Sequence, residues 1–262
     1  MQKLFIPALN TLTLVLTIFF NYWAAIARFN GVTVEDISVT YYGLYYPADY
    51  AFHVWGLIYL GMAALLAFQW FETLTGRNGG EITGIWLTIT NVANSLWIYA
   101  WIHQMVGLSV IFMFFLLMSL LRQVVLFNME CWDAPLRIIF FVWWPISTYL
   151  GLIIVSMFSM VIAFLERQGW DGGPLGPELW AIILILATGA IYMSLIFTRN
   201  MRETAIIGAW VIVGIAVKQW EKTPSVAYAS IIVSVLMLAA VVWHGYKNRQ
   251  YSVFAKLSRN EF

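Results

Sequence analysis

Eight long apolar runs constrain this chain more than any other feature of its sequence. A helix needs roughly 20 apolar residues to cross a hydrocarbon core of about 30 Å. The fifth run is longer than this and the seventh is shorter. We therefore predict an all-α, polytopic transmembrane helix bundle, and we treat residues 1–262 as a single membrane domain. The runs are Leu4–Ala27, Asp49–Phe71, Thr83–Trp101, Gly107–Phe127, Leu136–Leu165, Glu178–Phe197, Thr204–Val217 and Ser225–Trp243.

The composition supports this class and excludes several functions. Hydrophobic residues make up 62% of the chain and charged residues only 10%, whereas about 25% of the residues of a soluble domain are charged. The net charge of +1 argues against a nucleic-acid partner. The single cysteine, Cys131, excludes an intrachain disulfide and a cysteine-based metal site. With three histidines and no motif for a nucleophile or cofactor, we expect no metal, no required cofactor and no enzymatic activity.

Basic residues predict how the bundle is oriented. With eight spans both termini lie on one side, and ten of the 14 Lys and Arg residues fall there. Because cytoplasmic loops are rich in Lys and Arg, we expect both termini in the cytoplasm and place the protein in a bacterial inner membrane. Ala25-Ile26-Ala27 offers a cleavage-like site, but the apolar run before it is too long for a signal peptide. The ten residues are Lys3, Arg77, Arg122, Arg137, Arg199, Arg202, Lys247, Arg249, Lys256 and Arg259.

Two helices carry aromatic residues at helical spacing. Phe52, Trp55 and Tyr59 share one face of the second run, and Trp97 and Trp101 share one face of the third. Asn91 and Asn94 precede these two tryptophans, and an asparagine at membrane depth needs a partner. The two asparagines either bond a neighbouring helix or line a ligand pocket, and the sequence leaves both alternatives open.

A proline interrupts the fifth run. Pro145 removes a helical hydrogen bond and bends the helix, and Ser147 and Thr148 are placed to compensate. Trp143 and Trp144 come just before the bend, so the bend is expected to shape a cavity wall.

The second and third runs resemble the tryptophan-rich sensory protein family, the bacterial relatives of the mitochondrial translocator protein (peripheral benzodiazepine receptor). The first core helix of that family reads approximately P-x-W-x-F-x-x-V-W-x-x-L-Y, which Phe52, Val54-Trp55 and Ile58-Tyr59 match. Its next helix carries N-x-x-W, matched by Asn94 and Trp97.

A later helix of the family carries a proline followed by an aromatic residue and a tryptophan. Pro145 and Tyr149 match this pattern in part, with Leu152 nearest to the expected tryptophan. The resemblance covers about residues 47–197, which would supply the family's five-helix core, with residues 4–27 and 204–243 as added helices. It implies a bundle, often dimeric, that binds porphyrin, haem or sterol-like ligands.

The expected ligand-binding residues combine both lines of argument. Flat aromatic ligands stack on Trp and Tyr, while a few polar groups orient them. The set is Phe52, Trp55, Tyr59, Asn91, Asn94, Trp97, Trp101, Trp143 and Tyr149.

Asp49 and His53 form a separate hypothesis. They stand four residues apart near the outer end of the second helix, where the carboxylate could orient the imidazole or raise its pKa. The alternatives are an interfacial hydrogen bond, a pH-sensing pair or a haem ligand, although the helical wheel points His53 away from Trp55. Lys218, at the end of a short run, is expected at the membrane interface.

Three functions compete at this stage. The first is a membrane receptor or sensor that binds a planar hydrophobic ligand between its helices. The second is a transporter of such metabolites, for which Pro145 supplies one possible broken helix. The third, which has least support, is an enzyme that acts on bound porphyrin. The expected partners are the lipid bilayer, a hydrophobic small molecule and a second copy of the chain.

Overall fold

The computed structural model describes residues 2–26, 37, 43–77, 79–251 and 253–259, and no strand occurs among them. Eight long helices occupy the eight predicted runs, which confirms the all-α polytopic bundle. They are α1 (Gln2–Ile26), α3 (Val54–Leu74), α4 (Trp86–Ile102), α5 (Val106–Leu126), α7 (Trp144–Arg167), α8 (Gly176–Arg199), α9 (Arg202–Gln219) and α10 (Pro224–Lys247).

Six segments of the described chain are long and apolar enough to cross a membrane, and α4 and α9 are not among them. These two helices have 17 and 18 residues. Both bury more than half of their residues against neighbouring helices. A helix enclosed by protein needs less apolar surface than one that faces lipid. This explains why α4 contains Asn91 and Asn94 and why α9 begins with Arg202-Glu203.

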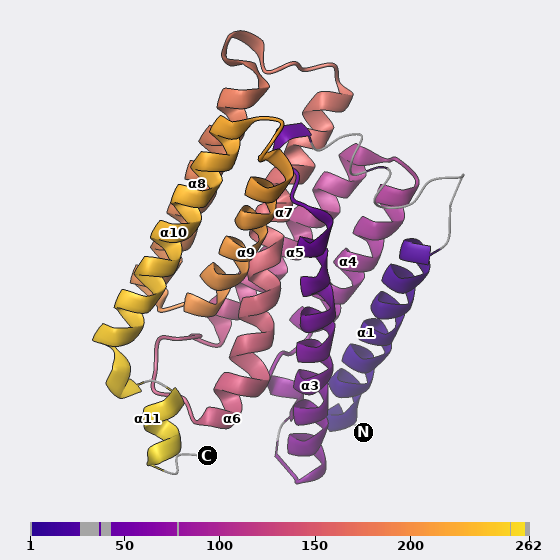
Figure 1. Cartoon of the computed structure of the whole chain (residues 1–262). Coiled ribbons are helices and arrows are strands. Elements are labelled where there is room, and N and C mark those ends of the chain that lie inside the picture. Colours follow the sequence, from indigo (N-terminus) through magenta and orange to yellow (C-terminus); the bar gives the residue numbers. More distant parts are fainter. Residues whose placement is uncertain (1, 27–36, 38–42, 78, 252, 260–262) are drawn as a thin grey trace.

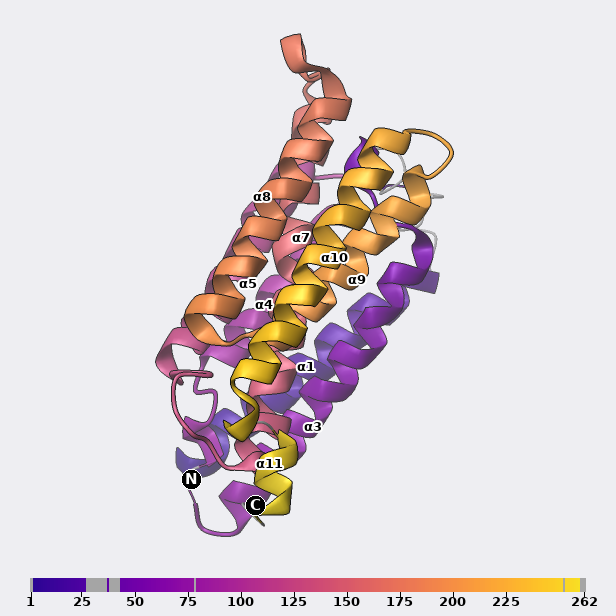
Figure 2. The ribbon, with the colours of Figure 1, turned by 60° about the vertical axis from the view of Figure 1, so that its left-hand side comes forward.

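The long helices form two groups that meet through α7 (Figures 1 and 2). In the first group α4 packs between α1 and α5, and α1 also contacts α3. In the second group α9 packs against α10 and α8. Helix α7 contacts α5 on one side and α9 on the other, so it is the joint between the groups.

The fifth run is interrupted, as its proline predicts. A short helix, α6 (Leu136–Ile138), leads into a π-helical segment, η4 (Ile139–Trp143), which ends just before Pro145. The expected compensation by Ser147 is wrong, because its buried hydroxyl has no partner. The helix instead accommodates the proline by widening into π turns, a form that often marks functional positions.

The connection between α4 and α5 is a tight hairpin. Helix α4 ends at Ile102 and α5 begins at Val106, and Gln104 adopts a left-handed backbone with φ 55°. Of residues 28–46, which join α1 to the segment before α3, only 37 and 43–46 are described.

Candidate functional site

Four of the predicted aromatic residues meet around Trp55. Its ring stacks on Tyr59 at 5.5 Å and on Trp97 at 6.2 Å between centroids, and it meets Tyr149 edge-on at 5.7 Å. The first two residues come from α3, Trp97 from α4 and Tyr149 from α7. We call Trp55, Tyr59, Trp97 and Tyr149 the aromatic cluster.

Asn94 holds one member of the cluster in place. Its Nδ2 donates to Tyr149 Oη at 2.7 Å, and its Oδ1 accepts from Asn21 Nδ2 of α1 at 2.7 Å. The side chain is fully buried. Asn94 therefore bonds two neighbouring helices and fixes the Tyr149 ring, while it is not among the residues that line the cavity beside that ring.

Asn91 belongs to a polar seam between α1 and α4. Its Nδ2 donates to Thr13 Oγ1 at 3.2 Å, and its carbonyl accepts from Thr17 Oγ1 at 2.9 Å. Nearer the start of α1, Asn10 extends these contacts to α3 by donating to Gln69 Oε1 at 3.2 Å. These contacts place Asn91 among interhelical bonds rather than at the aromatic cluster.

A small cavity of about 70 Å³ lies next to the aromatic cluster, between α3, α4, α7 and α9. None of its lining residues is charged. Its two serines, Ser156 and Ser159, donate their hydroxyls to carbonyls of their own helix. Recognition here would rest on shape and ring stacking. The lining comprises Pro47, Phe52, Trp55, Trp97, Trp101, Leu152, Val155, Ser156, Ser159 and Val211.

A short segment before α3 forms part of the wall of this cavity and is bonded to α9. It contains η2 (Asp49–His53) and supplies Pro47 and Phe52 to the lining. The backbone N–H of Ala48 donates to the carbonyl of Gly214 at 2.9 Å. A Cβ on Gly214 would lie 3.0 Å from those of Pro47 and Ala51, so the glycine permits the close approach.

The hypothesis that Asp49 orients His53 needs correction. Both residues lie on a 3₁₀ helix rather than on the α-helix that their spacing assumed, and His53 is exposed. Asp49 Oδ1 instead lies 3.6 Å from Lys218 Nζ, which also sits over the Tyr46 ring at 5.3 Å. Lys218 thus helps to hold the segment before α3 on α9.

Trp143 lies apart from the aromatic cluster. Its ring meets Trp132 edge-on at 5.7 Å and lines a second pocket of about 520 Å³ at the opposite end of the bundle. The π segment turns Trp143 toward this pocket, which the helical-wheel argument could not reveal.

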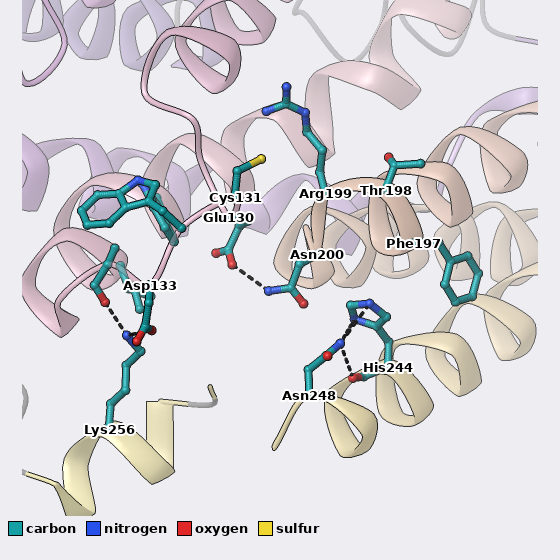
Figure 3. Close-up of a pocket in the computed structure, with 14 residues that line it drawn as sticks. Glu130, Cys131, Asp133, Phe197, Thr198, Arg199, Asn200, His244, Asn248 and Lys256 are labelled. Carbon is teal, nitrogen blue, oxygen red and sulfur yellow. Dashed lines mark hydrogen bonds and ion pairs between the residues drawn. The ribbon is translucent and has the colours of Figure 1, made fainter. Parts of the chain in front are cut away.

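The second pocket is polar and joins segments far apart in sequence (Figure 3). Glu130 accepts a hydrogen bond from Asn200 Nδ2 at 2.9 Å, and Lys256 of α11 (Val253–Ser258) pairs with Asp133 and donates to the Ala134 carbonyl at 2.6 Å. On the far side of the pocket, at the end of α10, the side chains of His244 and Asn248 are within hydrogen-bond distance of each other.

Glu130 is the unusual group of this pocket. It adopts a left-handed backbone with φ 60°, a strained state for a non-glycine residue. Burial raises the pKa of its carboxyl to about 8, and the nearby Glu203 carboxylate acts in the same direction. Sequence reasoning missed this residue, because a lone glutamate in a loop between helices carries no signal of burial.

The described residues contain no group of three or more His, Cys, Asp or Glu side chains arranged to hold a metal ion. The second pocket brings together acidic side chains, such as Glu130 and Asp133, and basic ones, such as Arg199 and Lys256. What it can do is bind a polar or charged group by hydrogen bonding.

One comparison with known proteins is informative. A family model described as TSPO-like protein matches residues 7–243, which include most of α1 and all of α9. No curated protein and no solved structure matches the chain. The division into a core at 47–197 and added helices stays a prediction. In the structure, α1 is linked to the aromatic cluster, because Asn21 bonds Asn94, which in turn bonds Tyr149.

Proposed function

Since the chain belongs to the TSPO-like protein family and is an integral membrane protein, we propose that it is a receptor or sensor for a planar hydrophobic ligand. The ligand class is a porphyrin or haem, or a sterol-like molecule. We place the site at the aromatic cluster and the cavity beside it. Binding, not catalysis, is the proposed role, and we retain the cytoplasmic termini, the bacterial inner membrane and the homodimer as parts of the proposal.

One observation carries this proposal. The Trp55 ring is held between Tyr59 and Trp97 beside a charge-free cavity, in a part of the bundle where water is scarce. Offset stacking is the arrangement in which aromatic rings attract a flat ligand. The buried Tyr59 hydroxyl of the aromatic cluster has no hydrogen-bond partner, and it would become a donor to the ligand only if the cavity extended to it.

The cavity must widen to admit the ligand. Its volume is about 70 Å³, whereas sites for drug-sized molecules span about 300–1,000 Å³. The part of the wall formed by Pro47 and Phe52 is the element whose displacement would enlarge it. The proposal therefore includes movement of this segment away from Gly214.

Transport of the same ligand is the second candidate. The π segment before Pro145 is an irregularity in an otherwise continuous membrane helix, Leu136–Arg167, and it could open into the kind of broken helix that is common in transporters. Flux into vesicles separates the two functions, because a ligand that binds but does not cross the bilayer excludes transport.

Tryptophan fluorescence tests the proposed site. The detergent-purified protein is titrated with protoporphyrin IX and with haemin, alongside Trp97→Ala and the exposed interface variant Trp243→Ala. We expect saturable quenching in the wild type, and an affinity about tenfold lower only in Trp97→Ala, because ring stacking is lost. Quenching that never saturates, or equal losses in both variants, means nonspecific partitioning and removes the site.

A further inference from the structure

A groove on the outward face of α10 is the feature that the proposed ligand site does not use. Its walls are apolar side chains at helical spacing, all on the side of α10 that faces away from the bundle. The residues are Val235, Leu238, Ala239, Val242, Trp243 and Tyr246.

The length of the groove matches one leaflet of a bilayer. Val235 and Tyr246 stand eleven residues apart, which is about 16 Å along a helix. Half of a hydrocarbon core is about 15 Å. Because α10 ends at Lys247, the groove runs from one interface to about the middle of the membrane.

Two cations mark the interfacial end of the groove. Lys247 Nζ lies 5.5 Å from the centroid of the Trp243 ring, and the Arg249 guanidinium lies 4.7 Å from that of Tyr246. Both side chains are exposed, and within the described part of the chain neither forms an ion pair. Among the described residues, the apolar groove thus ends in two positive charges that have no ion-pair partner and lie over its own aromatic residues.

The opposite face of α10 has a different character. His244 and Asn248 line the polar pocket of Figure 3 and not the groove. Trp243 lines the groove and contacts Phe197, a residue of the pocket lining, at 5.9 Å between ring centroids, so these two rings lie between the pocket and the groove. The charge at the groove end is therefore not cancelled by Glu130 or Asp133, which lie on the pocket side.

We propose that this groove binds one anionic phospholipid, with its phosphate between Lys247 and Arg249 and an acyl chain along Val242, Leu238 and Val235. An arginine guanidinium binds phosphate through paired donors, and a lysine adds a point charge. Basic residues at this depth favour anionic lipids over zwitterionic ones. The cationic end of the groove fits the phosphate of such a lipid, and the apolar length of the groove, about half a bilayer, fits an acyl chain.

Native mass spectrometry of the whole protein tests the site. Protein released from nanodiscs of phosphatidylcholine with added phosphatidylglycerol is scored for bound phosphatidylglycerol. The wild type should retain one such lipid, and Lys247→Gln combined with Arg249→Gln should lower its affinity about tenfold or more. The matched control is Arg122→Gln, which removes a cation that also lies over a tryptophan ring, that of Trp86 at 5.8 Å, away from the groove.

A second pair of variants tests the groove without touching its charges. Ala239→Trp fills the groove, whereas Leu236→Trp enlarges an exposed residue of α10 outside it. Only the first should release the lipid. Equal retention of phosphatidylcholine, equal losses in the control variants, displacement by inorganic phosphate alone, or a lipid-free dimer through this face would each overturn the proposal.

Discussion

The two helix groups hold themselves together by different means. Helices α1, α3 and α4 are joined by amide and hydroxyl side chains such as Asn10, Gln69 and Asn91. Helices α8, α9 and α10 rely on glycines: a Cβ on Gly208 would lie 2.3 Å from the Tyr192 ring, and one on Gly189 would lie 2.5 Å from Val233.

This contrast illustrates the two ways in which helices associate when water is absent. Interhelical hydrogen bonds contribute about 0.6 kcal/mol each on average, whereas small residues allow close backbone approach and extensive van der Waals contact. Hydrogen bonds tolerate small adjustments, but a close-packed interface cannot absorb added volume. We therefore expect the glycine-packed group to be the more sensitive to substitution.

The largest effect is expected at Gly208. Gly208→Val places methyl groups inside the Tyr192 ring and should lower the free energy of unfolding by about 3 kcal/mol. Thermal unfolding in detergent measures this loss. Gly56→Val is the control, because a Cβ there meets nothing within 4 Å. Similar losses in both variants would mean that helix propensity, not packing, sets the cost.

A substitution at Asn10 tests the helix group that is joined by polar side chains. Its side chain bonds Gln69, Thr83 and Thr88 in a fully buried position. Asn10→Leu leaves those partners unsatisfied and should cost about 2 kcal/mol of unfolding free energy. Chemical unfolding compared with Leu12→Ala, on the exposed face of α1, measures it. A cost above that of Gly208→Val would reverse the comparison.

Glu130 should make the stability of the second group depend on pH. Its folded-state pKa of about 8 lies above the ordinary value of 4.5, so its stabilising contribution is complete below about pH 4.5 and is lost as the pH rises to about 8. Burial is the main cause of the raised pKa, and the Glu203 carboxylate adds to it, whereas Arg202, Lys256 and the hydrogen bond from Asn200 act in the opposite direction.

Glu130→Gln removes this titration. Allowing for the pocket's access to water, the wild type should lose about 1 to 2 kcal/mol relative to the variant between pH 5 and pH 8. Unfolding of both proteins across this range in the same detergent measures the difference. Parallel pH profiles would show that the carboxyl titrates as it does in water.

The smallest effect is expected at Asn94, which bonds neighbouring helices and also holds Tyr149 of the aromatic cluster. Asn94→Ala frees the Tyr149 hydroxyl and the Asn21 amide, so the aromatic cluster should loosen. We expect a several-fold loss of protoporphyrin IX affinity, less than for Trp97→Ala, because no stacking ring is removed. Fluorescence titration measures it, with Asn91→Ala as the matched asparagine outside the cluster. Equal losses would assign both residues to helix packing alone.

Helical periodicity was sufficient to predict part of the site. Trp55 and Tyr59 are four residues apart, and this spacing alone brings their rings together. The pairing of Trp55 with Trp97 needed two helices to meet, which the resemblance to a known family suggested. The position of Trp143 was not predictable, because a π turn rotates every residue that follows it and leaves no mark in the hydrophobic pattern.

Contacts between segments far apart in the chain could not be predicted from the sequence. Asp49 pairs with Lys218 and Glu130 bonds Asn200, across separations that no periodicity links. The groove on α10 has its spacing in the sequence, but only the packed bundle shows which face of α10 is left uncovered.

Hydropathy by itself determined that this protein is an all-helical membrane bundle and where its helices lie, because the cost of exposing apolar residues to water acts on each run independently. The tertiary structure alone decided which rings share a cavity, which charges are paired and which carboxyl is buried. Those properties depend on distances between side chains from different helices, and such distances arise only when the helices pack.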